Sequence, residues 1–323
     1  MPERQTIYPQ KGGSLNDSEK LELCRLLVKA GYTVRITAEK PRGNGTAVRA
    51  EGNNKEKQHI LSGSEPFLKY LDVSDRNGRI HDKKQAKVRQ INRFLEQVRD
   101  ILPYLPQEGV IRVCDLCCGK SYLSFAVYHY FANVLHRTVK MTGVDLKADV
   151  IKLCNETADA LGFEGLEFLA GDVSAYDAGE KVHLVISLHA CDTATDLVLD
   201  RAMSWNADVI LSTPCCHHEL NHTIQCPTLS FITDHSMLRQ KLCDAATDAL
   251  RLKRLEAAGY ATAALELIDP EETPKNVMLR GLRKKNFSPD SADARRLWAE
   301  YEAARAFLLG DAPTTLASCD GKE

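Results

Sequence analysis

The sequence predicts an α/β fold with a doubly wound, mostly parallel sheet, and three observations support this. Short apolar runs alternate with stretches of helical periodicity between residues 109 and 212. Each of the first three runs has an aspartate at its end, and a turn of small residues follows the first. The last two runs are separated only by the seven residues DPEETPK. Because parallel strands need long crossovers and antiparallel strands do not, we expect five parallel strands and a terminal antiparallel pair.

The first repeat, residues 110–131, carries the clearest signal. An apolar run over 110–116 predicts a buried strand, and apolar residues recur at helical spacing from Leu123 to Tyr130. In such a strand–turn–helix unit, backbone N–H groups and the helix N-terminus approach a ligand closely. The turn has one glycine where a dinucleotide fingerprint has three, which makes an NAD enzyme the least favoured interpretation.

The same alternation predicts the remaining elements in order. Further strands are expected over residues 140–146, 166–170, 182–188, 207–212, 261–268 and 276–283. Helices are expected over residues 150–161, 193–203 and about 237–258. The resulting sheet has seven strands, of which the last two pair antiparallel.

Four segments follow from this assignment. Residues 1–63 are predicted to form a small N-terminal α/β module, and residues 64–108 a basic helical entry segment with a helix from about 82 to 102. Residues 109–285 form the predicted cofactor-binding domain. Residues 286–323 are expected to form a C-terminal helix, capped near Ser288 or Asp290, and a tail.

Composition restricts the class of protein. The chain has 323 residues, 44% of them apolar, and no apolar run approaches the ~20 residues that span a bilayer. Eleven cysteines without a secretory signal at the N-terminus indicate reduced thiols and a cytoplasmic location. A net charge of −2 excludes a globally basic nucleic-acid binder, but residues 76–99 are dense in Lys and Arg and predict a local basic surface.

Asp115, Asp145 and Asp172 close three successive predicted strands, where an open α/β sheet binds its ligand. Asp145 is suited to accept hydrogen bonds from both hydroxyls of a ribose, and Asp172 from an adenine amino group. Asp115 is suited to orient the turn or to contact an ammonium group. The alternative is that each aspartate caps the following helix. Three such residues beside a small-residue turn favour a nucleoside ligand.

The motifs DLCCGKSYLSFAVYHYF, GVDLK, SLHACDTATD, TPCCHHEL, TPKN and QINRF occur in this order over roughly residues 60–285. As a set they resemble a family of class I S-adenosylmethionine-dependent methyltransferases, whose eukaryotic relatives are chiefly described as RNA methyltransferases. The resemblance implies a Rossmann-like domain with S-adenosyl-L-methionine as cofactor. The implied cofactor-binding residues are Asp115, Cys117, Cys118, Gly119, Lys120, Ser121, Tyr122, Asp145, Leu146, Asp172, Val173, Leu188 and His189.

The predicted catalytic set is His189, Asp192, Cys215 and His217, which follow the fourth and fifth strands. A base such as His189 or Asp192 can receive the proton of a hydroxyl or ring-nitrogen acceptor; the alternative for His189 is contact with adenine alone. A related tRNA 2′-O-methyltransferase family has Gly where this chain has Asp192. The atom that the related family methylates is therefore not assigned to this chain. The Cys and His residues of TPCCHHEL are sufficient for zinc, but adjacent side chains on an extended chain diverge, and no metal is predicted. A nucleophilic Cys215 is a weaker alternative.

The acceptor is predicted to be RNA, ribosomal or transfer, bound through the basic segment 76–99. Lys87, Gln90, Asn92 and Arg93 are the predicted substrate-binding residues. Two other interpretations stay open from the sequence. One is a small-molecule or protein methyltransferase on the same sheet, and the other is a non-catalytic RNA-binding or assembly module that retains the nucleoside pocket.

Overall fold

The computed structural model describes residues 60–188, 190–267 and 276–310. The predicted N-terminal module up to residue 59, the candidate base His189 and the tail from residue 311 therefore lie outside the described residues. No helix within the described ranges is long and apolar enough to cross a membrane.

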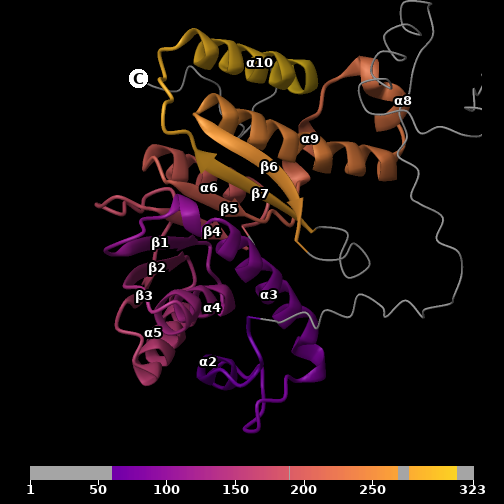
Figure 1. Cartoon of the computed structure of the whole chain (residues 1–323). Coiled ribbons are helices and arrows are strands. Elements are labelled where there is room, and N and C mark those ends of the chain that lie inside the picture. The colour runs from indigo at the N-terminus through magenta and orange to yellow at the C-terminus, as the bar shows by residue number, and fades with distance from the viewer. Residues whose placement is uncertain (1–59, 189, 268–275, 311–323) are drawn as a thin grey trace, which may run out of the picture. The chain divides into compact units, whose positions relative to one another are not determined.

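A seven-stranded sheet forms the centre of the described chain (Figure 1). Its strands are β1 (Ile111–Leu116), β2 (Val139–Asp145), β3 (Leu166–Ala170), β4 (Leu184–Ser187), β5 (Val209–Ser212), β6 (Tyr260–Glu266) and β7 (Val277–Arg283). The spatial order is β3-β2-β1-β4-β5-β7-β6. The first five strands pair parallel, and β7 pairs antiparallel with both β5 and β6. The predicted class I methyltransferase sheet is confirmed.

The strand order reverses between β1 and β4, which both lie at the middle of the sheet. The chain first runs outward through β2 to β3 and then returns to add β4 beside β1. In an open α/β sheet, ligands bind at this reversal, outside the carboxyl ends of the strands. The fold thus places the ends of β1, β2, β4 and β5 around one site.

Helices cover both faces of the sheet (Figure 1). On one face, α3 (Gln85–Asp100), α4 (Tyr122–His129) and α5 (Ala148–Leu161) pack against side chains such as Val113 of β1. On the other face, α6 (Thr193–Ser204) and α9 (Ser236–Ala257) pack against side chains such as Leu116. Alternate residues of each strand therefore serve two separate cores, which is why β4 and β5 are buried along their whole length.

Shorter helices connect these elements. They are α2 (Pro66–Tyr70), α7 (His218–Thr223), α8 (Ser230–Thr233), the 3-10 turns η1 (Asp82–Lys84), η2 (Leu102–Tyr104) and η4 (Pro227–Leu229), and the π-helical turn η3 (Tyr130–Val134). The C-terminal helix α10 (Ala292–Leu309) packs on α9. Its cap is Ser291, whose side chain accepts a hydrogen bond from the Ala294 N–H; this residue directly follows Asp290, near which the sequence placed the cap.

The entry helix α3 follows the predicted boundaries closely. Its apolar stripe, which includes Ile91, Phe94 and Leu95, is fully buried against the sheet domain. Burying each such side chain contributes roughly 1.5–3 kcal/mol. This burial fixes the orientation of the opposite, cationic face of α3 relative to the sheet.

Candidate functional site

The turn between β1 and α4 is held in a conformation that most residues avoid. Cys117, Gly119 and Ser121 have φ angles of 62°, 53° and 57°. This left-handed region costs a non-glycine residue roughly 1–2 kcal/mol, so two of the three positions are strained. Strained backbone of this kind is found preferentially at functional sites.

Two hydrogen bonds fix this turn against β2, and a third closes the turn itself. The Cys118 N–H donates to the Val144 carbonyl at 3.1 Å, and the Ser121 N–H donates to the Cys118 carbonyl at 2.9 Å. The Gly119 N–H donates to Asp145 Oδ2 at 2.8 Å. Asp145 thus holds the turn and faces the space that the turn encloses.

A half-open cavity of about 340 Å³ lies between the turn, the end of β2 and α3. Its lining residues are Lys87, Asp115, Cys117, Cys118, Gly119, Lys120, Ser121, Tyr122, Leu123, Asp145, Lys147 and Leu188. This volume is at the lower end of the range for small-molecule sites. Nine of the predicted cofactor-binding residues line it.

Asp115 is the most deeply buried acid of the cavity, with 2% of its surface exposed. Its Oδ2 accepts a hydrogen bond of 2.5 Å from the Ser124 hydroxyl. Burial, with a smaller contribution from the charge of Asp145, raises its pKa to about 7, against the lowering effect of the Ser124 hydrogen bond. A buried carboxyl of this kind is stabilised by a cation, and an amino-acid ammonium group fits that requirement.

Two lysines of the entry segment reach the same cavity. Lys84 Nζ lies 3.4 Å from the Tyr122 hydroxyl and 5.4 Å from the centre of its ring, a cation–π contact. Lys87 lines the cavity, and burial, followed by the charge of Lys84, lowers its pKa. The N-terminal end of the entry helix therefore lies at the edge of the sheet where the cavity opens.

Three predicted cofactor residues lie outside this cavity. Leu146 is 73% exposed, and Asp172 Oδ1 accepts a hydrogen bond from the Ser174 N–H at 2.7 Å. Val173 is buried, and its carbonyl accepts from Arg201 Nε at 3.1 Å. Asp172 keeps its place at the end of β3, and contact between these three residues and a cofactor stays a prediction.

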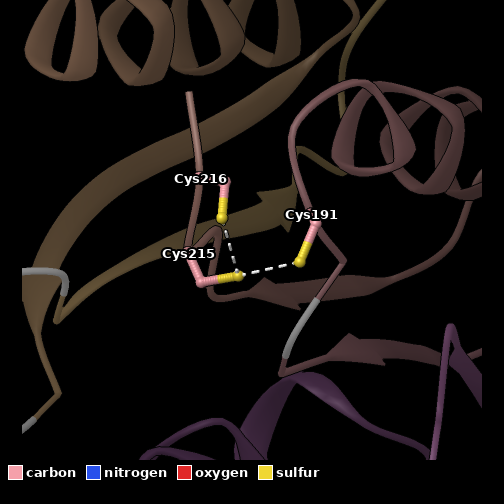
Figure 2. Close-up of side chains that lie close together, drawn as sticks. All are labelled: Cys191, Cys215 and Cys216. Atoms are coloured by element: carbon pink, nitrogen blue, oxygen red, sulfur yellow. Dashed lines mark hydrogen bonds between the residues drawn. The ribbon is translucent and has the colours of Figure 1, made fainter. Parts of the chain in front are cut away.

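On the other side of the strand ends, three thiols converge (Figure 2). Cys191 Sγ, after β4, lies 3.1 Å from Cys215 Sγ, and Cys215 Sγ lies 3.7 Å from Cys216 Sγ. The expectation that adjacent side chains diverge was wrong, because residues 214–217 follow β5 in irregular rather than extended conformation. Burial, followed by the hydrogen bond and charge of Cys191, raises the pKa of Cys215 far above its ordinary value. A protonated thiol is a poor nucleophile, which disfavours covalent catalysis by Cys215.

Asp192 and His217, two predicted catalytic residues, are both engaged within the protein. Asp192 Oδ1 accepts the N–H groups of His218 and Glu219, at 2.9 and 3.1 Å, and so caps the N-terminus of α7. His217 is 4% exposed, and its Nε2 lies 2.8 Å from Asp248 Oδ1. We therefore correct both predictions: Asp192 positions a loop, and His217 is a buried structural residue.

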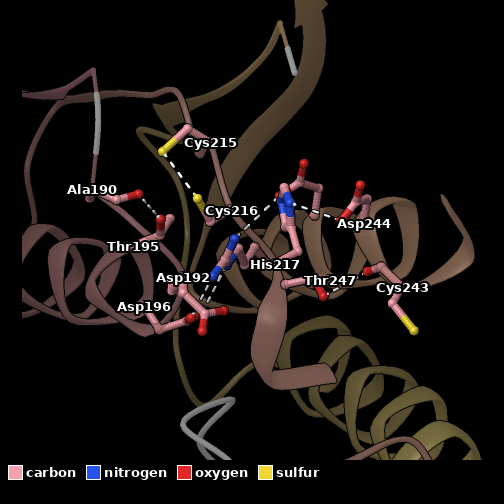
Figure 3. A network of polar contacts seen from close by, with 12 residues as sticks. Ala190, Asp192, Thr195, Asp196, Cys215, Cys216, His217, Cys243, Asp244 and Thr247 are labelled. Atoms are coloured by element: carbon pink, nitrogen blue, oxygen red, sulfur yellow. Dashed lines mark hydrogen bonds and ion pairs between the residues drawn. The ribbon is translucent and has the colours of Figure 1, made fainter. Parts of the chain in front are cut away.

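A buried polar network ties these loops to α9 (Figure 3). Arg251, which is 1% exposed, contacts Asp196 through Nε and Nη2 at 3.0 and 2.7 Å. Its Nη1 lies 3.3 Å from Asp248 Oδ1, and its Nη2 donates to the Asp192 carbonyl at 2.8 Å. Sequence reasoning missed Arg251, although a cation on the apolar stripe of a helix is a usable signal.

Some of the predicted substrate-binding residues are held by contacts within the protein, and one lies at the cavity. Asn92 is 3% exposed; its Oδ1 accepts from the Leu61 N–H at 2.8 Å, and its Nδ2 donates to Val88. Its side chain holds the entry segment together and is not available to an acceptor, which corrects that prediction. Arg93 pairs with Glu96 at 2.6 Å, and Gln90 accepts from Lys87 Nζ at 3.3 Å. Only Lys87 of this set lines the cavity.

Comparison with known proteins agrees with this geometry. Residues 86–223, less than half of the chain, match the family model of a methyltransferase domain. The human glutathione S-transferase C-terminal domain-containing protein is 21% identical over 237 residues, which cover 65% of this chain. Its homologue in Drosophila melanogaster is 25% identical over 219 residues, or 58% of this chain. The match spans 35% of the length of each of these curated relatives.

Among solved structures, magnesium protoporphyrin IX methyltransferase from Synechocystis PCC 6803, with bound SAH, is 13% identical with a TM-score of 0.42. That match covers 70% of this chain and 97% of the other. The 23S rRNA methyltransferase ErmE is 12% identical with a TM-score of 0.38, over 64% of this chain and 75% of the other. The fold assignment itself rests on the strand order.

The strand order and the cavity agree with the match of residues 86–223 to a methyltransferase domain, a class that uses S-adenosylmethionine as cofactor. The residues present fit this cofactor, because two carboxylates line a cavity that must take a sulfonium and an ammonium group. We expect Asp115 and the β1–α4 turn to hold its amino-acid part, and Asp145 its ribose.

Proposed function

We propose that this enzyme transfers the methyl group of S-adenosylmethionine to RNA. The observation that carries the proposal is the placement of α3, which brings Lys84 and Lys87 to the edge of the cofactor cavity. Further cations of the segment 76–99, including Arg76 and Lys83, are exposed. A phosphate backbone bound along this segment would deliver a nucleotide to the cavity mouth.

The bound cofactor supplies an electrophilic methyl group on a sulfonium sulfur. An acceptor atom attacking in line would take this methyl group as its bond to sulfur breaks, and a hydroxyl or amine acceptor would give up its proton. Such a displacement chiefly requires that the protein align the methyl group with the acceptor atom, and the fixed β1–α4 turn helps to hold the cofactor for this. Because Asp192 Oδ1 caps α7, we keep His189 as the predicted proton acceptor. His189 directly follows Leu188, which lines the cavity.

The acceptor class can be tested by adding the purified protein, together with methyl-labelled cofactor, to an extract from cells that lack the gene. We expect the label in material that ribonuclease destroys and protease does not. Label in protease-sensitive or small-molecule fractions would overturn the RNA acceptor and leave the methyltransferase in place. Cofactor binding without any transfer would favour the non-catalytic module.

RNA binding should depend on salt through the cations of the entry segment. Replacing exposed Arg76 and Lys83 by Ser should reduce the slope of log K against log salt by about 1.4, since each lost single-strand phosphate contact removes about 0.7. The matched control is Lys284→Ser with Lys285→Ser, two exposed cations beside residues that begin β4 and β5, at the opposite edge of the sheet. Equal slopes in the two double variants, measured by fluorescence titration, would contradict this surface.

Cofactor affinity should rise with pH through the titration of Asp115. The carboxyl of Asp115 ionises near pH 4 in the unfolded chain and near pH 7 in the folded, cofactor-free protein. Between these pH values the folded protein holds one more proton than the unfolded chain, so its stability falls as pH rises. An ammonium beside Asp115 favours the carboxylate, so binding expels that proton and affinity should increase up to tenfold per pH unit until about pH 7.

Calorimetric titration from pH 5.5 to 8 checks the role of Asp115. Asp115→Asn should flatten the profile. Methylthioadenosine, which lacks the ammonium group, should show a flat profile with the unaltered protein. A steep profile for methylthioadenosine would place the responsible group elsewhere.

A further inference from the structure

We propose that Cys191, Cys215 and Cys216 form a three-thiolate site for a zinc ion beside the methyl-transfer cavity. The three sulfur atoms all lie within 4.8 Å of one another (Figure 2). Three thiolates bound to one tetrahedral zinc at about 2.3 Å form a triangle with sides of about 3.8 Å. The observed Cys215–Cys216 separation of 3.7 Å matches this triangle, and the Cys191–Cys215 separation of 3.1 Å is within a small side-chain movement of it.

The backbone that carries these thiols is fixed on both sides. Thr195 donates to the Ala190 carbonyl at 2.8 Å, and Asp192 caps α7, which begins directly after the segment of Cys215 and Cys216. Arg251 in turn holds the Asp192 carbonyl from α9. The two loops, which come from strands β4 and β5, are therefore joined by hydrogen bonds, so the thiols converge without help from a ligand.

The accessibility of the cluster matches an open metal site rather than a closed one. Cys191 is exposed, and Cys215 and Cys216 are half-buried. Three protein ligands and an accessible fourth position are the arrangement of catalytic zinc, whereas structural zinc has four protein ligands. Leu188, which lines the cofactor cavity, lies three residues before Cys191 in the sequence.

Binding of zinc at this site releases the protons of its thiol ligands. Coordination of Zn²⁺ by three thiolates sends these protons to solvent and leaves the site with a charge of −1. Water or a polar atom of the acceptor takes the fourth position. The site goes beyond the RNA proposal and does not depend on it, because it requires no particular acceptor.

Cobalt titration of the full-length protein tests the site directly. The protein is stripped with chelator and kept reduced with a phosphine, which does not compete as a thiol ligand. We expect one equivalent of Co²⁺ to produce a thiolate charge-transfer band and tetrahedral visible bands, both removed by Zn²⁺. Zinc binding in weak buffer should release about three protons.

Variants locate the metal and keep the test decisive. Cys191→Ser, Cys215→Ser and Cys216→Ser should each weaken Co²⁺ binding at least tenfold, while Cys226→Ser, a buried cysteine elsewhere, should not. If a serine variant does not fold, the site is tested by alkylating the cysteines of the unaltered protein with and without zinc. Zinc should protect only Cys191, Cys215 and Cys216 from alkylation. Absence of the bands under reducing conditions, or bands that persist in all three variants, would overturn the proposal. A Cys191–Cys215 disulfide as the only change would do the same.

Discussion

Asp145→Ala should weaken binding of S-adenosylmethionine by about two orders of magnitude. The carboxylate holds the β1–α4 turn through the Gly119 N–H and faces the cavity at the end of β2, where an acidic residue accepts the ribose hydroxyls. Hydrogen bonds to a charged group contribute roughly 1.5–3 kcal/mol each. Losing two of them amounts to about 3 kcal/mol or more, which is about a hundredfold in affinity. Isothermal titration with the cofactor and with S-adenosylhomocysteine measures the effect.

Two further variants separate the ribose contact from the rest. Asp149→Ala removes an exposed carboxylate in the first turn of α5, close in sequence to Asp145, and should leave affinity nearly unchanged. Asp145→Asn keeps an oxygen for the Gly119 N–H and loses the charge, so its affinity should lie between the two. Unaltered cofactor affinity in Asp145→Ala, with a thermal transition like that of the unaltered protein, would rule out this placement of the ribose.

The central sheet could be predicted because local patterns determine it. The buried runs, the helical crossovers and the seven-residue loop before β7 are each contained in a short stretch of sequence. The strand-end acids Asp115 and Asp145 followed from the same patterns, since parallel strands bring their carboxyl ends to one edge. Both line the cavity.

Side-chain roles that depend on distant contacts were not predictable in this way. Asp192 looked free to face the cleft, but its φ of 50° turns it toward backbone N–H groups 26 and 27 residues away. The convergence of Cys191 with Cys215 depends on two loops 24 residues apart. Periodicity describes neighbours on one element and does not describe which loops meet.

Asn92 is a different case, because its burial was visible in the sequence. It lies four residues after Val88, on the stripe that also carries Ile91 and Leu95, and so shares the buried face of α3. A polar residue on such a stripe must find hydrogen-bond partners within the fold, and Asn92 finds them at Leu61. Its position should have indicated a structural role.

Arg251→Met should destabilise the protein by about 3–5 kcal/mol, the largest effect on stability that we expect. The arginine is 1% exposed, and its guanidinium is shared between Asp196 and Asp248. Without it, Asp196 stays buried with no compensating charge, which is the costly way to break a buried ion pair. At this chain length the change corresponds to a fall in Tm of about 10 °C, measured by differential scanning calorimetry.

Matched variants show whether buried charge is the cause. Arg296→Met removes an arginine of α10 whose two ion pairs are largely exposed, and should shift Tm little. Adding Asp196→Leu to Arg251→Met removes the uncompensated carboxylate and should recover part of the loss, because a buried ion pair replaced as a whole is tolerated better than one half of it. If the double variant is less stable than Arg251→Met, the arginine acts by packing and by its bond to the Asp192 carbonyl, and the carboxylate is not the source of the instability.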